Sequence, residues 1–275
     1  MMKYRRATVL GIVIVLAAFF LGLMSVDSAT AYESKLNTIA KKGQLRVGWA
    51  NWFPYIHIDP KTNKISGFTV DFYEEMARVL NVKLVWVEDK WATLVAGMAA
   101  DKYDMICNAN KSLSRLLAAE YGGPIARTDM RYLVRKADVG PGKKFETWKD
   151  VDKKGVRLGL AMGTTADKKL TDTIKQAEIV RLQGDPEVIL SIRTKKVDVY
   201  ATDEMTLILL EKEYPELTIL PGVWSSSEMG LYVPQGDQIL LNWVNWFIWD
   251  MKREGKIEGW LEKYEIKGVS VVPTP

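Results

Sequence analysis

The sequence predicts an α/β protein made of two doubly wound lobes that are joined by a two-strand hinge. Segments with the spacing of buried strands alternate with segments of helical spacing along the chain, which is typical of sheets covered by helices. One strand pattern occurs twice. The chain also has 275 residues, 48% of them hydrophobic, and single hydrophobic cores usually divide at about this size.

The first copy of the pattern predicts strands at 45–50, 83–87 and 103–107, with helices over 68–80 and 91–98 between them. The second copy predicts strands at 155–159 and 196–199. Each copy has a strand that follows a glycine, and later a strand that begins with Lys-x-Asp: residues 102–104 in the first copy and residues 196–198 in the second. We therefore expect two related lobes, the first being larger.

Two extended segments are candidates for the connections between the lobes. These are residues 128–135 and 229–233. They divide the chain into a discontinuous lobe 1 (32–128 and 229–275) and a lobe 2 (129–228) that includes the hinge strands. Because open parallel sheets bind ligands beyond the carboxyl ends of their strands, we expect a closing cleft between the lobes.

The amino terminus has the order of a secretory signal peptide. A basic stretch is followed by an apolar run and then by Ala-Thr-Ala at 29–31. We predict a signal peptide over 1–31, cleavage after Ala31 and a periplasmic mature protein. The alternative is an uncleaved anchor, because the apolar run approaches the length that spans a bilayer.

Composition excludes several function classes. Lys plus Arg number 38 and Asp plus Glu 34, so the formal net charge is only +4, which argues against nucleic acid as a partner. A single cysteine and a single histidine exclude an internal disulfide and metal sites built from several such ligands. We expect no metal and no cofactor.

Several motifs, in order along the chain, resemble the extracytoplasmic solute-binding protein family 3, which serves polar amino-acid ABC importers. They are Gly-Gln-Leu-Arg-Val-Gly (43–48), Trp-Phe-Pro-Tyr (52–55), Gly-Phe-Thr-Val-Asp (67–71) and Gly-(x)3-Gly-Thr-Thr (159–165). The resemblance implies a fold like that of type II periplasmic binding proteins. It also implies a monomer that delivers a small-molecule ligand to a permease in the inner membrane.

A zwitterionic ligand needs groups of both charges, and the resemblance provides candidates. Arg115 matches the arginine that binds the ligand carboxylate with two parallel hydrogen bonds. Gly163, Thr164 and Thr165 begin a helix, whose amides suit the same carboxylate. Asp203 matches the acid that pairs with the ammonium. The plainer interpretations are a solvated arginine and ordinary helix N-caps at Thr164 and Asp203.

Two tryptophans, Trp52 and Trp91, match positions where the family places aromatic rings on either side of the ligand side chain. Asn110 and Ser112 are further candidates, although the loop before Arg115 departs from the family pattern and leaves their register open. Trp49 stands where binders of lysine-like ligands tend to have an acid, which favours an apolar, aromatic or neutral polar ligand.

We expect a binding protein that closes over its ligand and performs no covalent chemistry. One alternative is an enzyme similar to cyclohexadienyl dehydratases, which resemble this family and use a glutamate shortly after the position of Asp203. Here Glu204 is directly adjacent and Thr206 falls where that glutamate is expected. A second alternative is a subunit that presents its ligand to a sensor or chemoreceptor.

Overall fold

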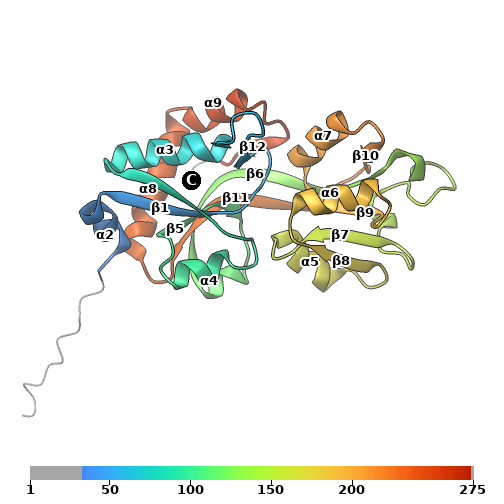
Figure 1. The fold of residues 1–275 in the computed structure, drawn as a ribbon, viewed down its shortest axis with the longest axis horizontal. Helices are drawn as coiled ribbons and strands as arrows, with labels where there is room; N and C mark the ends of the chain where they lie inside the picture. The colour runs from blue at the N-terminus through green and yellow to red at the C-terminus, as the bar shows by residue number, and fades with distance from the viewer. Residues whose placement is uncertain (1–32, 274–275) are drawn as a thin grey trace, which may run out of the picture. The chain divides into compact units, whose positions relative to one another are not determined.

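A computed structural model of the protein describes residues 33–273. Its large sheet contains ten strands (Figure 1). They are β1 (Gln44–Trp49), β4 (Lys83–Glu88), β5 (Met105–Asn110), β6 (Ala119–Arg135), β7 (Arg157–Ala161), β8 (Glu178–Leu182), β9 (Val199–Asp203), β10 (Leu217–Ile219), β11 (Ser225–Pro234) and β12 (Val269–Val271). A small hairpin pairs β2 (His57–Ile58) with β3 (Ile65–Ser66).

Eight α-helices accompany these strands within residues 33–273. They are α2 (Lys35–Lys42), α3 (Phe68–Leu80), α4 (Leu94–Ala99), α5 (Thr165–Thr173), α6 (Asp185–Arg193), α7 (Glu204–Glu213), α8 (Gln238–Arg253) and α9 (Lys256–Lys263). Short 3-10 helices are η1 (Arg115–Leu117), η2 (Lys136–Asp138) and η3 (Trp148–Asp150). Helix α4 begins three residues later than predicted, so Trp91 lies in the turn before it.

The sheet order, β4-β1-β5-β11-β6-β9-β7-β8, confirms the predicted fold class. In what we call the first half, β1 pairs in parallel with β4 and β5, and in the second half β7 pairs in parallel with β8 and β9. The long strands β6 and β11 pair with each other in the antiparallel sense and connect the two halves.

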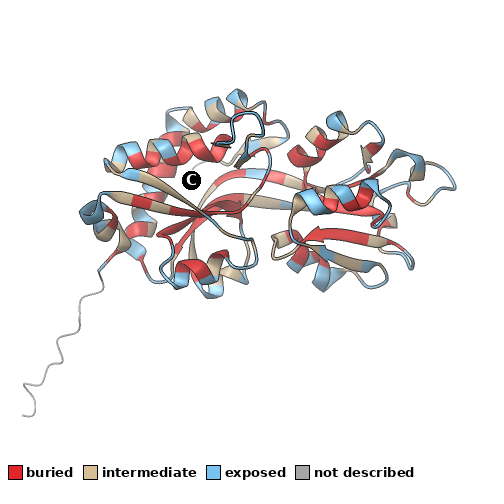
Figure 2. Cartoon of the chain, in the orientation of Figure 1, coloured by how far each residue is buried: buried red, intermediate tan, exposed pale blue. Residues whose placement is uncertain are grey.

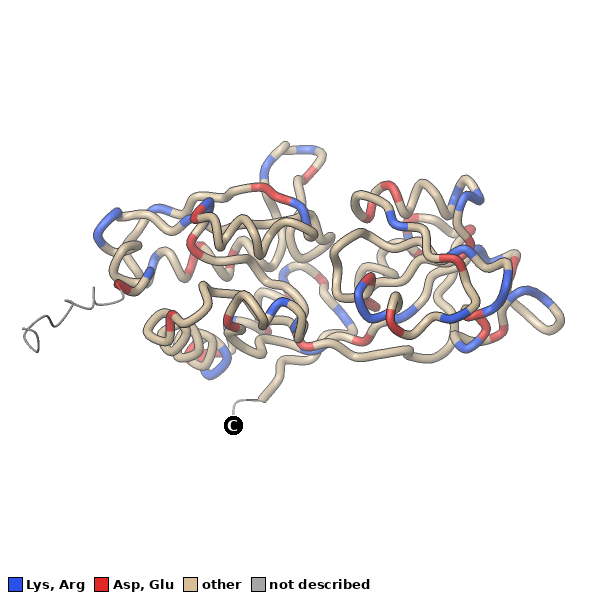
Figure 3. Tube along the Cα trace, turned by 90° about the horizontal axis from the view of Figure 1, so that it is seen from below, with Lys and Arg blue, Asp and Glu red and all other residues tan. Residues whose placement is uncertain are grey.

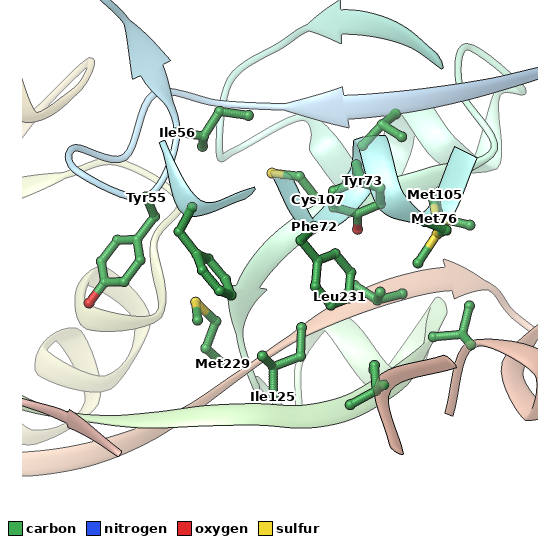
Figure 4. Packing of buried hydrophobic residues seen from close by; sticks show 14 of the residues in the cluster. Tyr55, Ile56, Phe72, Tyr73, Met76, Met105, Cys107, Ile125, Met229 and Leu231 are labelled. Atoms are coloured by element: carbon green, nitrogen blue, oxygen red, sulfur yellow. The ribbon is translucent and has the colours of Figure 1, made fainter. Parts of the chain in front are cut away.

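Helices cover both faces of each half, as buried apolar positions require. In the first half α3, α8 and α9 enclose the largest hydrophobic cluster, and α4 packs on the opposite face. Figure 2 shows the buried residues along the strands and the inner sides of the helices, and Figure 4 shows Phe72, Met105, Cys107 and Leu231 within the large cluster. In the second half α5 contributes to one cluster, whereas α6 and α7 contribute to another.

The repeated strand pattern corresponds to a repeated side-chain interaction. In the first half Arg46 donates its backbone N–H and its Nε–H to the buried Asp104. In the second half Arg157 makes the same two donations to the buried Asp198. Each pair links the first strand of its half to the parallel strand beside it, so the two halves share a local design.

The predicted signal peptide and its cleavage after Ala31 lie outside the described residues. Within the described part of the chain, no helix is both long and apolar enough to cross a membrane. Basic and acidic residues are interspersed along the chain trace (Figure 3).

Candidate functional site

A cavity lies where strands of both halves end. It contains about 420 Å³ of space, part of which is open to solvent. Its walls include the ends of β5, β7 and β9 and the beginnings of α5 and α6, which is the edge at which open α/β sheets bind ligands. The lining residues are Trp52, Trp91, Asn110, Arg115, Met130, Ala161, Thr164, Thr165, Ala166, Asp185, Ala201 and Thr202.

Arg115 begins η1, directly after the loop that follows β5. Its guanidinium donates to the backbone oxygens of Asn110 (3.3 Å) and Gly163 (3.2 Å), which belong to different halves. It also lies 5.6 Å from the ring of Trp91 and 5.7 Å from that of Tyr232. Burial lowers the pKa of Arg115. Within residues 33–273 no carboxylate forms an ion pair with this guanidinium, so its cationic charge faces the cavity uncompensated.

The turn between β7 and α5 forms another wall. Thr164 is the N-cap of α5, since its hydroxyl accepts a hydrogen bond from the amide of Asp167. The ordinary N-cap that we named as the plainer interpretation of Thr164 is therefore present. Thr164 and Thr165 nevertheless both line the cavity, and amides in the first turn of a helix have no partner within that helix. Gly163 lines an adjoining opening instead.

Trp52 and Trp91 both line the cavity but contact each other. Their rings meet edge to face, with centroids 5.9 Å apart, and the Nε1–H of Trp91 donates to the backbone oxygen of Asn51. They therefore form one apolar corner rather than two facing walls. Trp49 is 2% exposed in the core and is not among the lining residues, so the inference about ligand charge that we drew from it has no support in the site.

Asn110 lies at the cavity wall, and its side-chain oxygen is buried without a hydrogen-bond partner among the described residues. Ser112 lies farther out. It lines two adjoining openings, and its hydroxyl shares a hydrogen bond with that of Ser114.

Asp203 is not brought to the cavity wall, although its sequence position predicted a contact with the ligand. Its carboxylate is fully buried and accepts hydrogen bonds from Trp52 Nε1 (2.8 Å) and the Tyr55 hydroxyl (3.2 Å). The amide and the hydroxyl of Thr206 and the hydroxyl of Thr202 also donate to it. Asp203 is thus the N-cap of α7, and protein donors occupy both its oxygens.

The carboxylate that does line the cavity belongs to Asp185, which the sequence analysis missed. Asp185 is the first residue of α6, and its Oδ1 accepts a hydrogen bond of 2.6 Å from the Tyr200 hydroxyl. Burial raises its pKa to about 6; the Tyr200 hydrogen bond opposes this rise, and the charges of Asp203 and Glu187 add to it. The sequence signal that could have identified Asp185 is the start of a helix shortly after the strand at 178–182. A residue at that point lies at the carboxyl edge of the sheet, where ligands bind.

These features together define a class of protein. Two α/β halves enclose a small cavity that carries one guanidinium, one carboxylate and an apolar corner, which is the composition of a site for a small charged solute. Among residues 33–273 no group of three His, Cys, Asp or Glu side chains could hold a metal ion.

The chain belongs to the bacterial extracellular solute-binding proteins, family 3, which it matches over residues 45–267. It is 25% identical over 252 residues to the L-cystine-binding protein TcyJ of Escherichia coli, with 91% of this chain and 92% of the relative covered. It is also 25% identical over 249 residues to the cyclohexadienyl dehydratase of Pseudomonas aeruginosa, covering 88% and 91% of the two chains. The predicted family is therefore confirmed, and most of the relatives are named as binding proteins.

Among solved structures, a mutant of ArgBP from T. maritima is similar to this chain with a TM-score of 0.76. The two share 25% sequence identity, and the similarity covers 84% of this chain and 98% of the other. The fold is thus that of amino-acid-binding members of the family, and the protein is a solute-binding protein.

Proposed function

We propose that this protein captures an amino acid or a similar small zwitterion and delivers it to an ABC importer. The observation that carries the proposal is the guanidinium of Arg115, which lines the cavity without a carboxylate partner among the described residues. Burying a charge is costly unless it is paired, and a ligand carboxylate would supply the pair through two charge-assisted hydrogen bonds.

The other lining residues have complementary roles in this proposal. Trp52 and Trp91 contact the apolar part of the ligand. The side-chain oxygen of Asn110, which has no partner among the described residues, accepts a hydrogen bond from a polar group of the ligand. Thr164 and Thr165 approach the carboxylate from the second half. Gly163 and Ser112 border the openings beside the cavity rather than the cavity itself.

Ligand capture by hinge closure is the mechanism that we propose, with lobe 1 formed by 32–128 and 229–275 and lobe 2 by 129–228. Contacts between the halves support it: Arg115 bonds to Gly163, Trp52 to Asp203, and the Thr206 hydroxyl to the backbone oxygen of Phe53. Closure would exclude water from the cavity, which strengthens each charged contact.

Relatives indicate the ligand class and the partner. Their names include L-cystine-binding and histidine-binding proteins and an amino-acid ABC transporter-binding protein of Haemophilus influenzae, and ArgBP has been solved in an arginine-bound form. We propose an amino acid as ligand and a membrane permease as partner. The protein would act as a periplasmic monomer after removal of residues 1–31.

Enzymatic activity is the second candidate, because one relative is a cyclohexadienyl dehydratase. The two positions just beyond Asp203 that the comparison with dehydratases concerns, Glu204 and Thr206, do not supply a free acid. Glu204 pairs with Arg131, and the hydroxyl of Thr206 is hydrogen-bonded to Phe53 and Asp203. We therefore propose that the protein is not an enzyme. Incubation with prephenate and arogenate tests this, since formation of an aromatic product would contradict it.

The binding proposal is tested by replacing Arg115 with alanine. Wild-type and R115A proteins are titrated calorimetrically with L-cystine, L-histidine and L-arginine, and their thermal melts are compared. Loss of a bidentate charged contact predicts a drop in affinity of about 100-fold or more. The matched control is R253A, because Arg253 is exposed on α8 and pairs with Asp250. Equal affinities of R115A and wild-type protein would remove Arg115 from the site.

A further inference from the structure

The cavity has a negative group as well as a positive one. Asp185 is the only carboxylate among its described lining residues, and Arg115 is the only cation. The two come from different halves, since Asp185 begins α6 and Arg115 begins η1. The cavity is thus polarised and offers opposite charges to one guest.

The carboxylate of Asp185 retains capacity to accept hydrogen bonds. Tyr200 donates to Oδ1, whereas no residue of the described chain donates to Oδ2, and no Lys or Arg pairs with the group. An ionised carboxylate can accept about four hydrogen bonds, so a ligand ammonium would find free acceptor positions here. Pairing with a cation would also offset the desolvation that disfavours the ionised form.

Asp203 presents the opposite situation. Four donor groups of the protein already donate to its oxygens, and the Thr206 hydroxyl shares its one hydrogen between Asp203 and the backbone oxygen of Phe53. The side chain is also fully buried. An ammonium could reach it only after Trp52 and Tyr55 had moved away, which would leave buried donors without acceptors. Such unpaired donors cost about 1–3 kcal/mol each.

We propose that Asp185 is the residue that accepts the ligand's ammonium group, and that it selects zwitterions over plain carboxylates. This inference rests on the proposed function and assigns the cationic end of the same ligand. Asp203 then has a structural role as the N-cap of α7 and as the acceptor for Trp52 and Tyr55.

The test compares amino acids with their deaminated analogues. Wild-type, D185N and D203N proteins are titrated with L-cystine, L-histidine and L-arginine, and with 3,3′-dithiodipropionate, imidazole-4-propionate and 5-guanidinopentanoate. For the amino acid that binds wild-type protein, D185N should lower the affinity about 10- to 100-fold, the range expected for a hydrogen-bonded charge. Its affinity for the matching analogue should change by no more than about twofold.

Two further variants separate a ligand contact from a folding defect. E187Q is the matched control, because Glu187 lies in the same first turn of α6 but does not line the cavity. At pH 7.5, where Asp185 is ionised with or without the charge of Glu187, this variant should bind like wild-type protein. Y200F removes the one hydrogen-bond donor to Asp185 and should change the amino-acid affinity by about two- to fivefold while leaving the analogue unaffected. Circular dichroism melts verify that each variant is folded.

The outcomes are distinguishable. If D185N keeps the wild-type ratio of amino-acid to analogue affinity, or if only D203N abolishes that ratio, the assignment to Asp185 is wrong although the protein still binds amino acids. If wild-type protein binds none of the six probes and none of the other standard amino acids in a thermal-shift screen, the proposed function itself fails, and the assignment fails with it.

Discussion

The indole Nε1 of Trp52 donates a hydrogen bond of 2.8 Å to the carboxylate of Asp203, a residue in the other half of the protein. The Tyr55 hydroxyl donates to the same carboxylate. Two aromatic residues of the loop after β1 thereby contact the end of β9, where α7 begins. This contact makes Asp203 part of the interface between the halves, and it gives Trp52 a polar role besides its place in the apolar corner.

Replacing Trp52 with phenylalanine should weaken the contact between the halves. The substitution keeps an aromatic ring but removes the indole N–H, while the remaining donors still occupy Asp203. We expect the free energy of unfolding to fall by about 0.5–1.5 kcal/mol beyond the loss from the smaller ring, as measured by urea denaturation. W86F is the control for ring size, because Trp86 packs at the edge of the core. Equal losses in both variants would assign no energy to the hydrogen bond.

Replacing Gly163 with alanine should hinder the approach of the two halves. A Cβ at this position would lie 2.5 Å from the backbone of Ala92, and the φ of +78° is one that favours glycine. We expect weaker ligand binding, measured by calorimetry, together with a loss of stability of about 1 kcal/mol. G142A separates the two effects, because Gly142 has a φ of +71° but no atom within 4 Å of its Cβ position. Affinity lowered equally in both variants would contradict the steric explanation.

Replacing Asp198 with asparagine should strongly destabilise the second half. Burial disfavours the charged form of Asp198, but hydrogen bonds from Arg157, Lys144 and Arg135 outweigh this effect and place its pKa well below the usual range. Leaving those cations without their buried partner predicts a loss of about 3–5 kcal/mol at pH 7, measured by urea denaturation.

The same group predicts a pH dependence. Because its folded-state pKa is depressed, Asp198 stabilises the fold fully above the pKa of the unfolded chain, and this contribution is lost as the pH falls toward the folded-state value. The difference in free energy of unfolding between wild-type and D198N proteins should therefore shrink as the pH falls from 5 to 3. The control D172N removes an exposed ion pair with Lys168 and should cost less than about 1 kcal/mol. A difference that stays constant down to pH 3 would contradict the assignment.

Amino-acid binding should weaken as the pH falls through about 6, where Asp185 becomes protonated. Burial is the main cause of this raised pKa; the hydrogen bond from Tyr200 on β9 opposes it, and the charges of Asp203 on β9 and Glu187 on α6 add to it. Arg115 lines the same cavity. Only the ionised form pairs with an ammonium, so the affinity should drop by up to about tenfold per pH unit below 6, as measured by calorimetry from pH 5 to 8. A profile for D185N as steep as that of wild-type protein would assign the titration to another group.

The stability of the ligand-free protein should decrease as the pH rises through about 6, whereas ligand binding should strengthen over the same range. The pKa of Asp185 is raised on folding, so protonation favours the folded state, and the ionised form opposes folding above pH 6. D185N should therefore melt at a higher temperature than wild-type protein at pH 7.5, and the two should converge near pH 4. A lower melting temperature for D185N at pH 7.5 would show that the carboxylate is mainly structural.

Local sequence patterns determined much of the architecture. The alternation of strand and helix spacing predicted the α/β class, and the repeated Lys-x-Asp strands indicated two related halves. The structure explains the repeat, because Asp104 and Asp198 each accept hydrogen bonds from an arginine on the neighbouring parallel strand. Arg115 and Thr164 were predicted from the resemblance to the family, because local sequence alone favoured a solvated arginine and an ordinary helix N-cap, and the structure places both at the cavity wall.

Only the tertiary structure decided which carboxylate reaches the cavity. Asp185 and Asp203 both stand where a strand of the second half gives way to a helix, and their local sequences do not distinguish them. The difference comes from Trp52 and Tyr55, about 150 residues earlier in the chain, whose donors occupy Asp203 and leave Asp185 at the cavity wall. Hydrogen bonds between such distant residues depend on how the two halves pack, which spacing along the chain does not encode.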